Sequence, residues 1–133
     1  MNCLTIKLPF PPKLLNPNAR VHHLRLAAEK KKYRQHCGWE CKAWGVNRFK
    51  ADQIHLHIQF HPPNARRRDR DNLIAAFKAG QDAIADILGR DDSEFHVSYA
   101  PIQPPDAAKL GFVIVRISDM PMIAEVPFRG WIK

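Results

Sequence analysis

The chain is predicted to have an α+β fold, with a small mixed β-sheet and two main helices. Residues 53–61 alternate between apolar and polar side chains, which is typical of a strand with one buried face. Residues 24–44 and 72–88 lack proline and carry apolar residues at helical spacing. A length of 133 residues suits one domain, so we expect a single domain over 1–133 with a C-terminal tail over 119–133.

The amino-acid composition indicates which kinds of partner and which cellular compartment suit the protein. Twenty-one Lys and Arg against 13 Asp and Glu give a formal charge of +8, which favours polyanionic partners, nucleic acid first. A basic protein without such a partner is the alternative. Three cysteines, an odd number without a secretory signal, indicate reduced thiols in the cytoplasm. No apolar run approaches the ~18 residues of a membrane span, so no membrane partner is expected.

The N-terminal third is predicted to form a strand, a loop and a helix. Apolar residues alternate within 3–8, and the prolines that follow end this strand. Residues 13–23 combine turn formers with Arg20 and two histidines, which indicates an exposed loop and a candidate phosphate contact. Residues 24–44 then form a long helix, rich in residues of high helix propensity.

The helix over 24–44 is expected to have one apolar side and one basic side. Its apolar stripe is predicted to contain Leu24, Ala27, Ala28, Cys37, Cys41 and Trp44. Its basic face carries Arg25, Lys30, Lys31, Lys32 and Arg34, and is either solvated or in contact with DNA. His36, Cys37 and Cys41 are zinc-ligand types, but no second ligand pair has matching spacing. We therefore favour buried, apolar cysteines.

Residues 53–61 form the clearest strand. Its apolar face, predicted to meet the helices, consists of Ile54, Leu56, Ile58 and Phe60. The other face carries a histidine row, His55, His57 and His61. This row is either a pH-sensitive or phosphate-contacting surface, or a polar face that is solvated or at a subunit interface; the second interpretation is favoured.

The second half is predicted to contain one helix and two strands. Asp71 or Asn72 can cap a helix over 72–88, and Gly89 suits its C-terminus. Gly80 weakens the middle of this helix, which indicates a close approach by another element or a break there. Strands are expected over 95–102 and 110–118, the latter apolar enough to be central in the sheet.

Acidic and basic residues meet just before this helix. Asp69 and Asp71 are two apart, so on an extended backbone their carboxylates point the same way and can share a divalent cation. Arg66, Arg67 and Arg68 directly precede them and can hold phosphate. This combination points to metal-assisted phosphodiester hydrolysis. The alternative is a helix cap with Arg–Asp ion pairs on the surface.

The string RRDRDN, followed by a helix and then DDS, resembles the RusA-type Holliday junction resolvases. That family is marked by DxDN after basic residues and by a second acidic pair beyond a helix. LPFPPKLLNPNARVHH and AAEKKKYR also look like the N-terminal segment of phage-borne, prophage-like members. The resemblance covers roughly residues 3–118. It implies a RusA-like fold and a magnesium-dependent endodeoxyribonuclease that resolves four-way DNA junctions in recombination and repair.

The resemblance also implies site residues. Asp69, Asp71 and Asp92 would bind Mg²⁺ and activate the attacking water, with Asp91 as the neighbouring member of the second acidic pair. The residues that would dock the phosphate backbone are Arg20, Lys30, Lys31, Lys32, Arg66, Arg67 and Arg68.

The family also uses a lysine on the helix after DxDN. Its best-known position is occupied here by Ala75. Lys78 is the natural replacement, because it keeps the spacing to the acidic residue that follows.

Helix length leads to an expectation about assembly. An unbroken helix over 72–88 separates its ends by ~24 Å at 1.5 Å per residue, which would carry Asp92 away from Asp69 and Asp71. We therefore expect an intertwined two-fold homodimer with shared sites, in which Gly80 marks a close helix contact. Two other functions stay open. They are a non-catalytic nucleic-acid-binding protein of the same fold and a metal-dependent nuclease or phosphatase with another substrate.

Overall fold

The computed structural model describes residues 2–105 and 109–121, which form an α+β structure with a four-stranded mixed sheet. The strands are β1 (Cys3–Pro9), β2 (Ile54–His61), β3 (Phe95–Tyr99) and β4 (Phe112–Ser118). The α-helices are α1 (His23–Trp44), α2 (Arg70–Ala76) and α3 (Lys78–Leu88). Short 3₁₀ turns lie at Lys13–Leu15, Val46–Arg48 and Asp92–Glu94. The α+β class and the small mixed sheet are confirmed, with three helices in place of two.

The sheet has the strand order β1-β4-β2-β3. β4 is antiparallel to both of its neighbours, β1 and β2, whereas β3 is parallel to β2. Because β4 pairs on both edges, its backbone hydrogen-bonding groups are satisfied within the sheet. The prediction of a central last strand is therefore confirmed.

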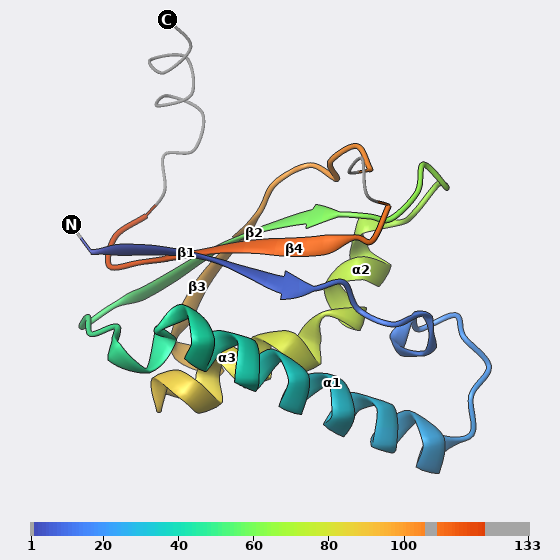
Figure 1. Cartoon of the computed structure of the whole chain (residues 1–133), viewed down its shortest axis with the longest axis horizontal. Coiled ribbons are helices and arrows are strands. Elements are labelled where there is room, and N and C mark those ends of the chain that lie inside the picture. The colour runs from blue at the N-terminus through green and yellow to red at the C-terminus, as the bar shows by residue number, and fades with distance from the viewer. Residues whose placement is uncertain (1, 106–108, 122–133) are drawn as a thin grey trace, which may run out of the picture.

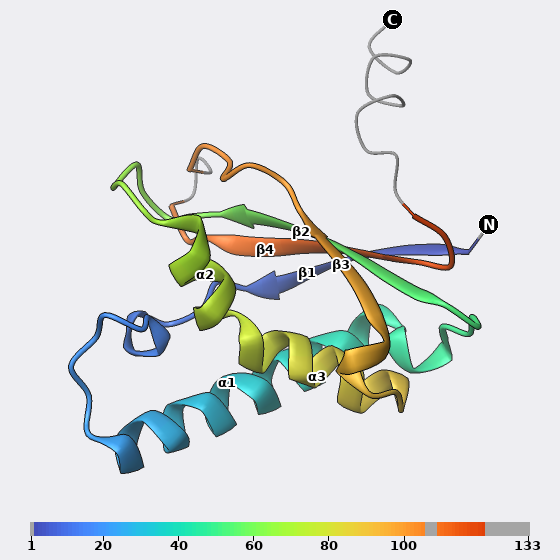
Figure 2. The same ribbon diagram turned by 180° about the vertical axis from the view of Figure 1, so that it is seen from behind.

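One face of the sheet is buried beneath helices. Figures 1 and 2 show α1 and α3 side by side along this face, with α2 beyond the end of α3. The buried residues of the strands alternate, as the pattern of residues 53–61 predicted for β2. The buried apolar ones are Ile6, Leu8, Ile54, Leu56, Ile58, Phe60, Val113, Val115 and Ile117. Burial of these side chains is the main stabilising contribution to the sheet and helix contact.

The apolar stripe predicted for α1 is correct only in its C-terminal half. Cys37 and Cys41 are fully buried, and burial raises the pKa of both thiols to about 12, which confirms the apolar interpretation. Tyr33 is also buried and donates a hydrogen bond to the Pro9 carbonyl at 2.5 Å. Leu24, however, is 68% exposed, because the first turns of α1 extend away from the sheet (Figure 1).

Near the N-terminus of α1, the predicted stripe residues Ala27 and Ala28 are exposed as well. At the opposite end Trp44 is 45% exposed and donates its indole N–H to the Lys7 carbonyl at 3.1 Å. The stripe therefore covers a shorter part of α1 than helical periodicity indicated.

The predicted helix over 72–88 is two helices that meet at Phe77. Phe77 has φ −84° and ψ −4°, and its ring is buried edge-on against Phe60 with ring centroids 5.8 Å apart. The ring also covers Gly80: a Cβ there would lie 2.5 Å from Phe77 Cε1. A close approach at Gly80 therefore exists within its own chain, made by the Phe77 ring. Gly89 ends α3 with φ 71°, as predicted.

The histidine row lies on the sheet face opposite the helices. His55 is only 8% exposed and stacks on His96 of β3 with ring centroids 4.5 Å apart. Burial, followed by the charge of His96, lowers the pKa of His55 below its ordinary value. His57 is hydrogen-bonded to Ser98 at 2.8 Å. This part of the row is therefore engaged within the sheet.

Two further expectations concern the ends of the chain and the membrane. Of the predicted tail, residues 122–133 lie outside the described residues. Asp119, at its start, is joined to Asn2 by two hydrogen bonds, Asn2 N to Asp119 Oδ2 at 3.0 Å and Asp119 N to Asn2 O at 3.1 Å. No helix in residues 2–105 and 109–121 is long and apolar enough to cross a membrane.

Candidate functional site

The acidic motif forms the N-terminus of α2. Asp69 is the capping residue, and its Oδ1 accepts a hydrogen bond from the backbone N–H of Asp71 at 2.9 Å. Asp71 lies in the first turn, where a carboxylate is favoured by the helix dipole. The predicted cap at Asp71 or Asn72 is wrong, because Asp69 is the residue whose carboxylate reaches a free N–H. Neither Asp69 nor Asp71 has an ion pair with an arginine in the described part of the chain.

The three arginines before α2 have different surroundings. Arg68 donates from Nη1 to the carbonyls of Asn64 and Arg66 and from Nη2 to Asn64 Oδ1, each at 3.0 Å. Its guanidinium lies 5.7 Å from the centroid of the Phe10 ring. Burial, followed by the charge of Arg66, lowers the pKa of Arg68 below its ordinary value. Arg68 thus shapes the loop, whereas Arg66 and Arg67 are exposed.

A cleft of about 730 Å³ lies beside this segment. We call it the arginine cleft. One wall comes from the N-terminal loop between Phe10 and Ala19, and the other from the arginine run, Asp69 and α2. The fold thus joins the loop predicted to contact phosphate to the arginine and aspartate motif, although about fifty residues separate them in sequence.

A second cavity, of about 630 Å³, lies between α1 and the two helices that follow the acidic motif. We call it the lysine groove. Its charged residues are Lys30, Lys31, Arg34, Lys78 and Asp82. Its remaining lining is apolar and includes Ala75, the position at which RusA-type resolvases carry their best-known lysine. The groove therefore brings two of the predicted DNA-binding lysines together with Lys78.

α2 forms the wall between the two cavities. Asn72 and Leu73 line the arginine cleft, Ile74 and Ala75 line the lysine groove, and Ala76 borders both. Two predicted DNA contacts lie outside both cavities: Arg20, in the loop before α1, and Lys32, on α1, are exposed.

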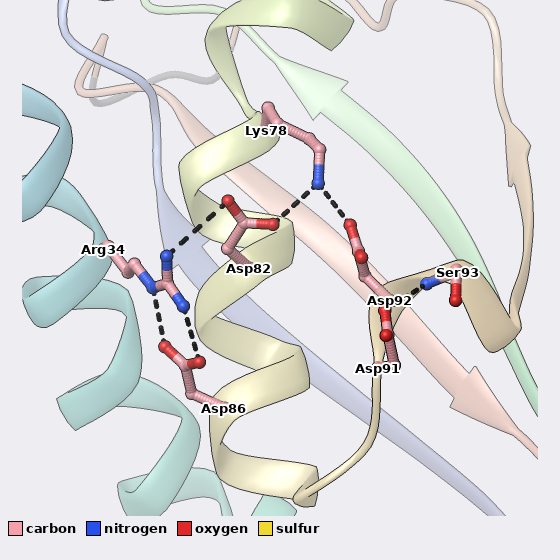
Figure 3. A network of polar contacts seen from close by, with 7 residues as sticks. All are labelled: Arg34, Lys78, Asp82, Asp86, Asp91, Asp92 and Ser93. Carbon is pink, nitrogen blue, oxygen red and sulfur yellow. Dashed lines mark hydrogen bonds and ion pairs between the residues drawn. The ribbon is translucent and has the colours of Figure 1, made fainter.

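A chain of charged contacts runs from α1 through α3 to the turn beyond it (Figure 3). Lys78 Nζ donates to Asp82 Oδ1 at 2.7 Å and also to Asp92 Oδ2. Arg34 of α1 donates twice to Asp86, both at 2.7 Å, and its Nη1 lies 3.8 Å from Asp82 Oδ2. Asp82 is therefore held between two cations, and Lys78 between two carboxylates.

The contacts of this chain of charges keep its lysine and aspartate side chains ionised. Partial burial lowers the pKa of Lys78, but the hydrogen bonds and charges of Asp82 and Asp92 outweigh it, so this pKa lies above its ordinary value. The hydrogen bond from Lys78 lowers the pKa of Asp92. The hydrogen bond from Arg34 does the same for Asp86. At neutral pH Lys78 is a cation and Asp92 an anion.

The position of Asp92 contradicts the expectation drawn from helix length. Lys78 is the first residue of α3, so its contact places Asp92 beside the first turns of this helix and not beyond its far end. The chain reverses at Gly89 and returns along α3, as Figure 3 shows. Asp91 caps the returning turn by accepting a hydrogen bond from Ser93 N at 3.0 Å. Sharing between chains is no longer needed to bring Asp92 back toward the start of α3.

The carboxylates do not form a preassembled metal site. Among the described residues of one chain, no three His, Cys, Asp or Glu side chains lie close enough together to hold a metal ion. Asp69 and Asp71 supply the oxygen donors that Mg²⁺ prefers, and Mg²⁺ usually binds one or two carboxylates together with waters and substrate phosphates. The residues therefore fit a Mg²⁺ ion recruited with phosphate, and they do not fit a closed protein cage.

Several residues of the site were not predicted from sequence. Asp82 had a local signal, since it lies four residues after Lys78, the spacing of a helical ion pair. Arg34 was assigned only to a basic face, and its partners lie on another helix. Phe10 and Asn18 had no signal, because only tertiary structure places them beside the arginines.

The structure gives the fold class of the chain, and the comparisons with known proteins give its family. The described residues form an α+β fold with a mixed four-stranded sheet. No protein-family model matches the sequence. An uncharacterized protein of Xylella fastidiosa (strain Temecula1) is 36% identical over 121 residues, which cover 86% of this chain and 75% of that protein. At this identity and coverage, the chain belongs to the same family as the Xylella protein. That relative has no assigned activity, so the resemblance to RusA-type resolvases stays a prediction.

Proposed function

We propose that the protein is a magnesium-dependent, structure-selective endodeoxyribonuclease that resolves four-way DNA junctions in the bacterial cytoplasm, as RusA-type enzymes do. The observation that carries the proposal is the contact between Lys78 and Asp92. The resemblance assigned a catalytic role to each of these two residues separately, from sequence alone. They are 14 positions apart, yet their side chains are in contact.

Cations around α2 support a DNA substrate. Arg66 and Arg67 line the arginine cleft on one side of this helix, and Lys30 and Lys31 line the lysine groove on the other. A phosphate backbone that crosses α2 would meet cations on both sides, with the carboxylates of the acidic motif between them. Binding through such contacts weakens steeply as salt concentration rises, because each neutralised phosphate releases counterions.

The contacts of Lys78 suit it to stabilise a charged transition state. Phosphodiester hydrolysis builds negative charge on the phosphate oxygens, and a fixed cation beside them lowers the barrier. Lys78 is half exposed and faces the groove, so it can reach a phosphate there. Asp82 orients it, and Arg34 in turn supports Asp82. In this proposal Asp82 is a positioning residue.

The acidic residues would take the metal. Asp69, Asp71 and Asp92 supply anionic oxygens, and Asp91 neighbours the last of them. When bound with a phosphate, Mg²⁺ would polarise it and lower the pKa of a bound water. The Asp92 side chain is partly exposed, so a ligand could reach this carboxylate beside Lys78.

A homodimer is part of the proposal. A four-way junction is resolved by two symmetric nicks, and a two-fold dimer supplies two equivalent sites. Because Lys78 and Asp92 meet within one chain, each subunit would bring this pair to its own site.

The test uses a labelled four-way junction and a linear duplex of the same sequence, each incubated with Mg²⁺ or EDTA. The proposal predicts paired nicks in the junction only with Mg²⁺. Binding without magnesium-dependent cleavage would instead favour the non-catalytic nucleic-acid-binding protein, which Ala75 at the family lysine position supports. Cleavage without preference for the junction would favour a nuclease or phosphatase with another substrate.

A further inference from the structure

We infer that the arginine cleft binds a single unstacked nucleotide at the branch point of the DNA. The inference rests on the proposed function. It adds a binding site for one nucleotide of the junction, which hydrolysis of the phosphodiester does not itself require. Four properties of the cleft support it: its apolar walls, its cations, the fixed guanidinium plane of Arg68 and two amide side chains.

The cleft is large and has apolar walls. Its volume of about 730 Å³ lies within the range of small-molecule pockets, roughly 300–1,000 Å³. Phe10, Pro63 and Leu73 contribute to the walls, and Leu110 stands at its edge with 79% of its surface exposed. A duplex backbone needs only cations on an open surface, whereas apolar walls suit the flat face of a base that has left its stack.

Within the part of the chain that the structure describes, the cations of the cleft lack acidic partners. Arg66 and Arg67 form no ion pair in residues 2–105 and 109–121. Lys13, from the opposite wall, adds a third charge and likewise has no acidic partner there. The one carboxylate that lines the cleft, Asp69, already caps α2. The cleft is therefore a cationic space that fits an anionic ligand such as a nucleotide phosphate.

Arg68 gives the cleft a rigid planar surface. Its three hydrogen bonds to the loop and its position over Phe10 hold the guanidinium in place. Nucleic-acid bases stack on guanidinium planes as well as on aromatic rings. Because the guanidinium is already fixed, stacking on it loses little side-chain entropy.

Amide side chains lie at the same cleft. The amides of Asn18 and Asn72 form no hydrogen bond with another described residue, although both residues line the cleft. An amide offers both a donor and an acceptor, which matches the edges of bases. Asn18 comes from the loop and Asn72 from α2, so the two approach from opposite walls.

The experiment places the fluorescent base 2-aminopurine at each branch-point position of a four-way junction and measures its emission on binding in the absence of Mg²⁺. Ala19→Trp fills the cleft from the loop, and Asn18→Ala removes one amide. Their matched controls are Ala43→Trp and Asn47→Ala, at exposed positions that do not line the cleft. Cleavage of the same junction is measured separately with Mg²⁺.

The inference predicts a several-fold rise in emission at one branch-point position for the wild type and both controls. Ala19→Trp should abolish this rise and weaken junction binding about tenfold, the size of one lost base-stacking contact. Asn18→Ala should weaken binding less and leave the rise. Junction cleavage without any rise, or a full rise in Ala19→Trp, would overturn the inference and leave the proposed function standing. A rise in emission without magnesium-dependent cleavage would support the inference and overturn the proposed function. Absence of junction binding would overturn both the inference and the proposed function.

Discussion

Replacing Lys78 with alanine should abolish most of the proposed activity without unfolding the protein. Loss of one preorganised group that stabilises charge in a transition state typically lowers the rate by about 10²–10³. The ion pairs of Lys78 with Asp82 and Asp92 involve a side chain that is 55% exposed, so solvent screens them. Exposed ion pairs of this kind contribute little to stability. The rate should therefore fall far more than the free energy of unfolding.

The assay is single-turnover cleavage of a labelled four-way junction with Mg²⁺, accompanied by binding measurements in EDTA and by denaturant unfolding. Lys31→Ala is the matched control, because Lys31 is also exposed and lines the same groove, yet has no acidic partner among the described residues. This control should weaken binding modestly and leave the rate at saturating protein unchanged. Lys78→Ala should leave junction binding nearly unchanged and lower the cleavage rate at saturating protein.

A second variant tests the position of the lysine. Ala75 lines the same groove as Lys78 and occupies the position at which RusA-type resolvases carry their best-known lysine. Adding Ala75→Lys to Lys78→Ala should restore part of the cleavage rate, because a cation would again reach the groove. If Lys78→Ala cleaves at the wild-type rate, or if Lys31→Ala loses as much of the rate, the catalytic role of Lys78 is refuted.

Three further predictions concern stability and thiol chemistry. Gly80→Ala should lower the free energy of unfolding by about 1–3 kcal/mol in denaturant titration, because the new Cβ would lie 2.5 Å from the Phe77 ring; unchanged stability would contradict this packing. In native protein only the exposed Cys3 should react quickly with a thiol reagent, whereas Cys37 and Cys41 should react only after unfolding. Burial raises the pKa of these two thiols from 9.0 to about 12, so stability should fall as pH rises above about 9, by roughly 1.4 kcal/mol per pH unit for each thiol. Cys41→Val should reduce that slope, and an unchanged slope would argue against the buried thiols as its source.

The sequence by itself determined the secondary structure where one local pattern dominated. The alternation in residues 53–61 identified β2 and its buried face, because successive side chains of a strand point to opposite faces. The apolar run before Ser118 identified β4 as central. Gly89 identified the end of α3, since a left-handed terminus favours glycine.

Only tertiary structure decided the arrangement of the site. The break at Phe77 depends on Phe60, which belongs to a strand and packs against the Phe77 ring. The return of Asp92 to Lys78 depends on the path of the chain after Gly89, which no periodicity encodes. The arginine cleft likewise joins segments about fifty residues apart. Local patterns record which side of an element is buried, whereas a site depends on contacts between elements, and packing of the whole core determines those contacts.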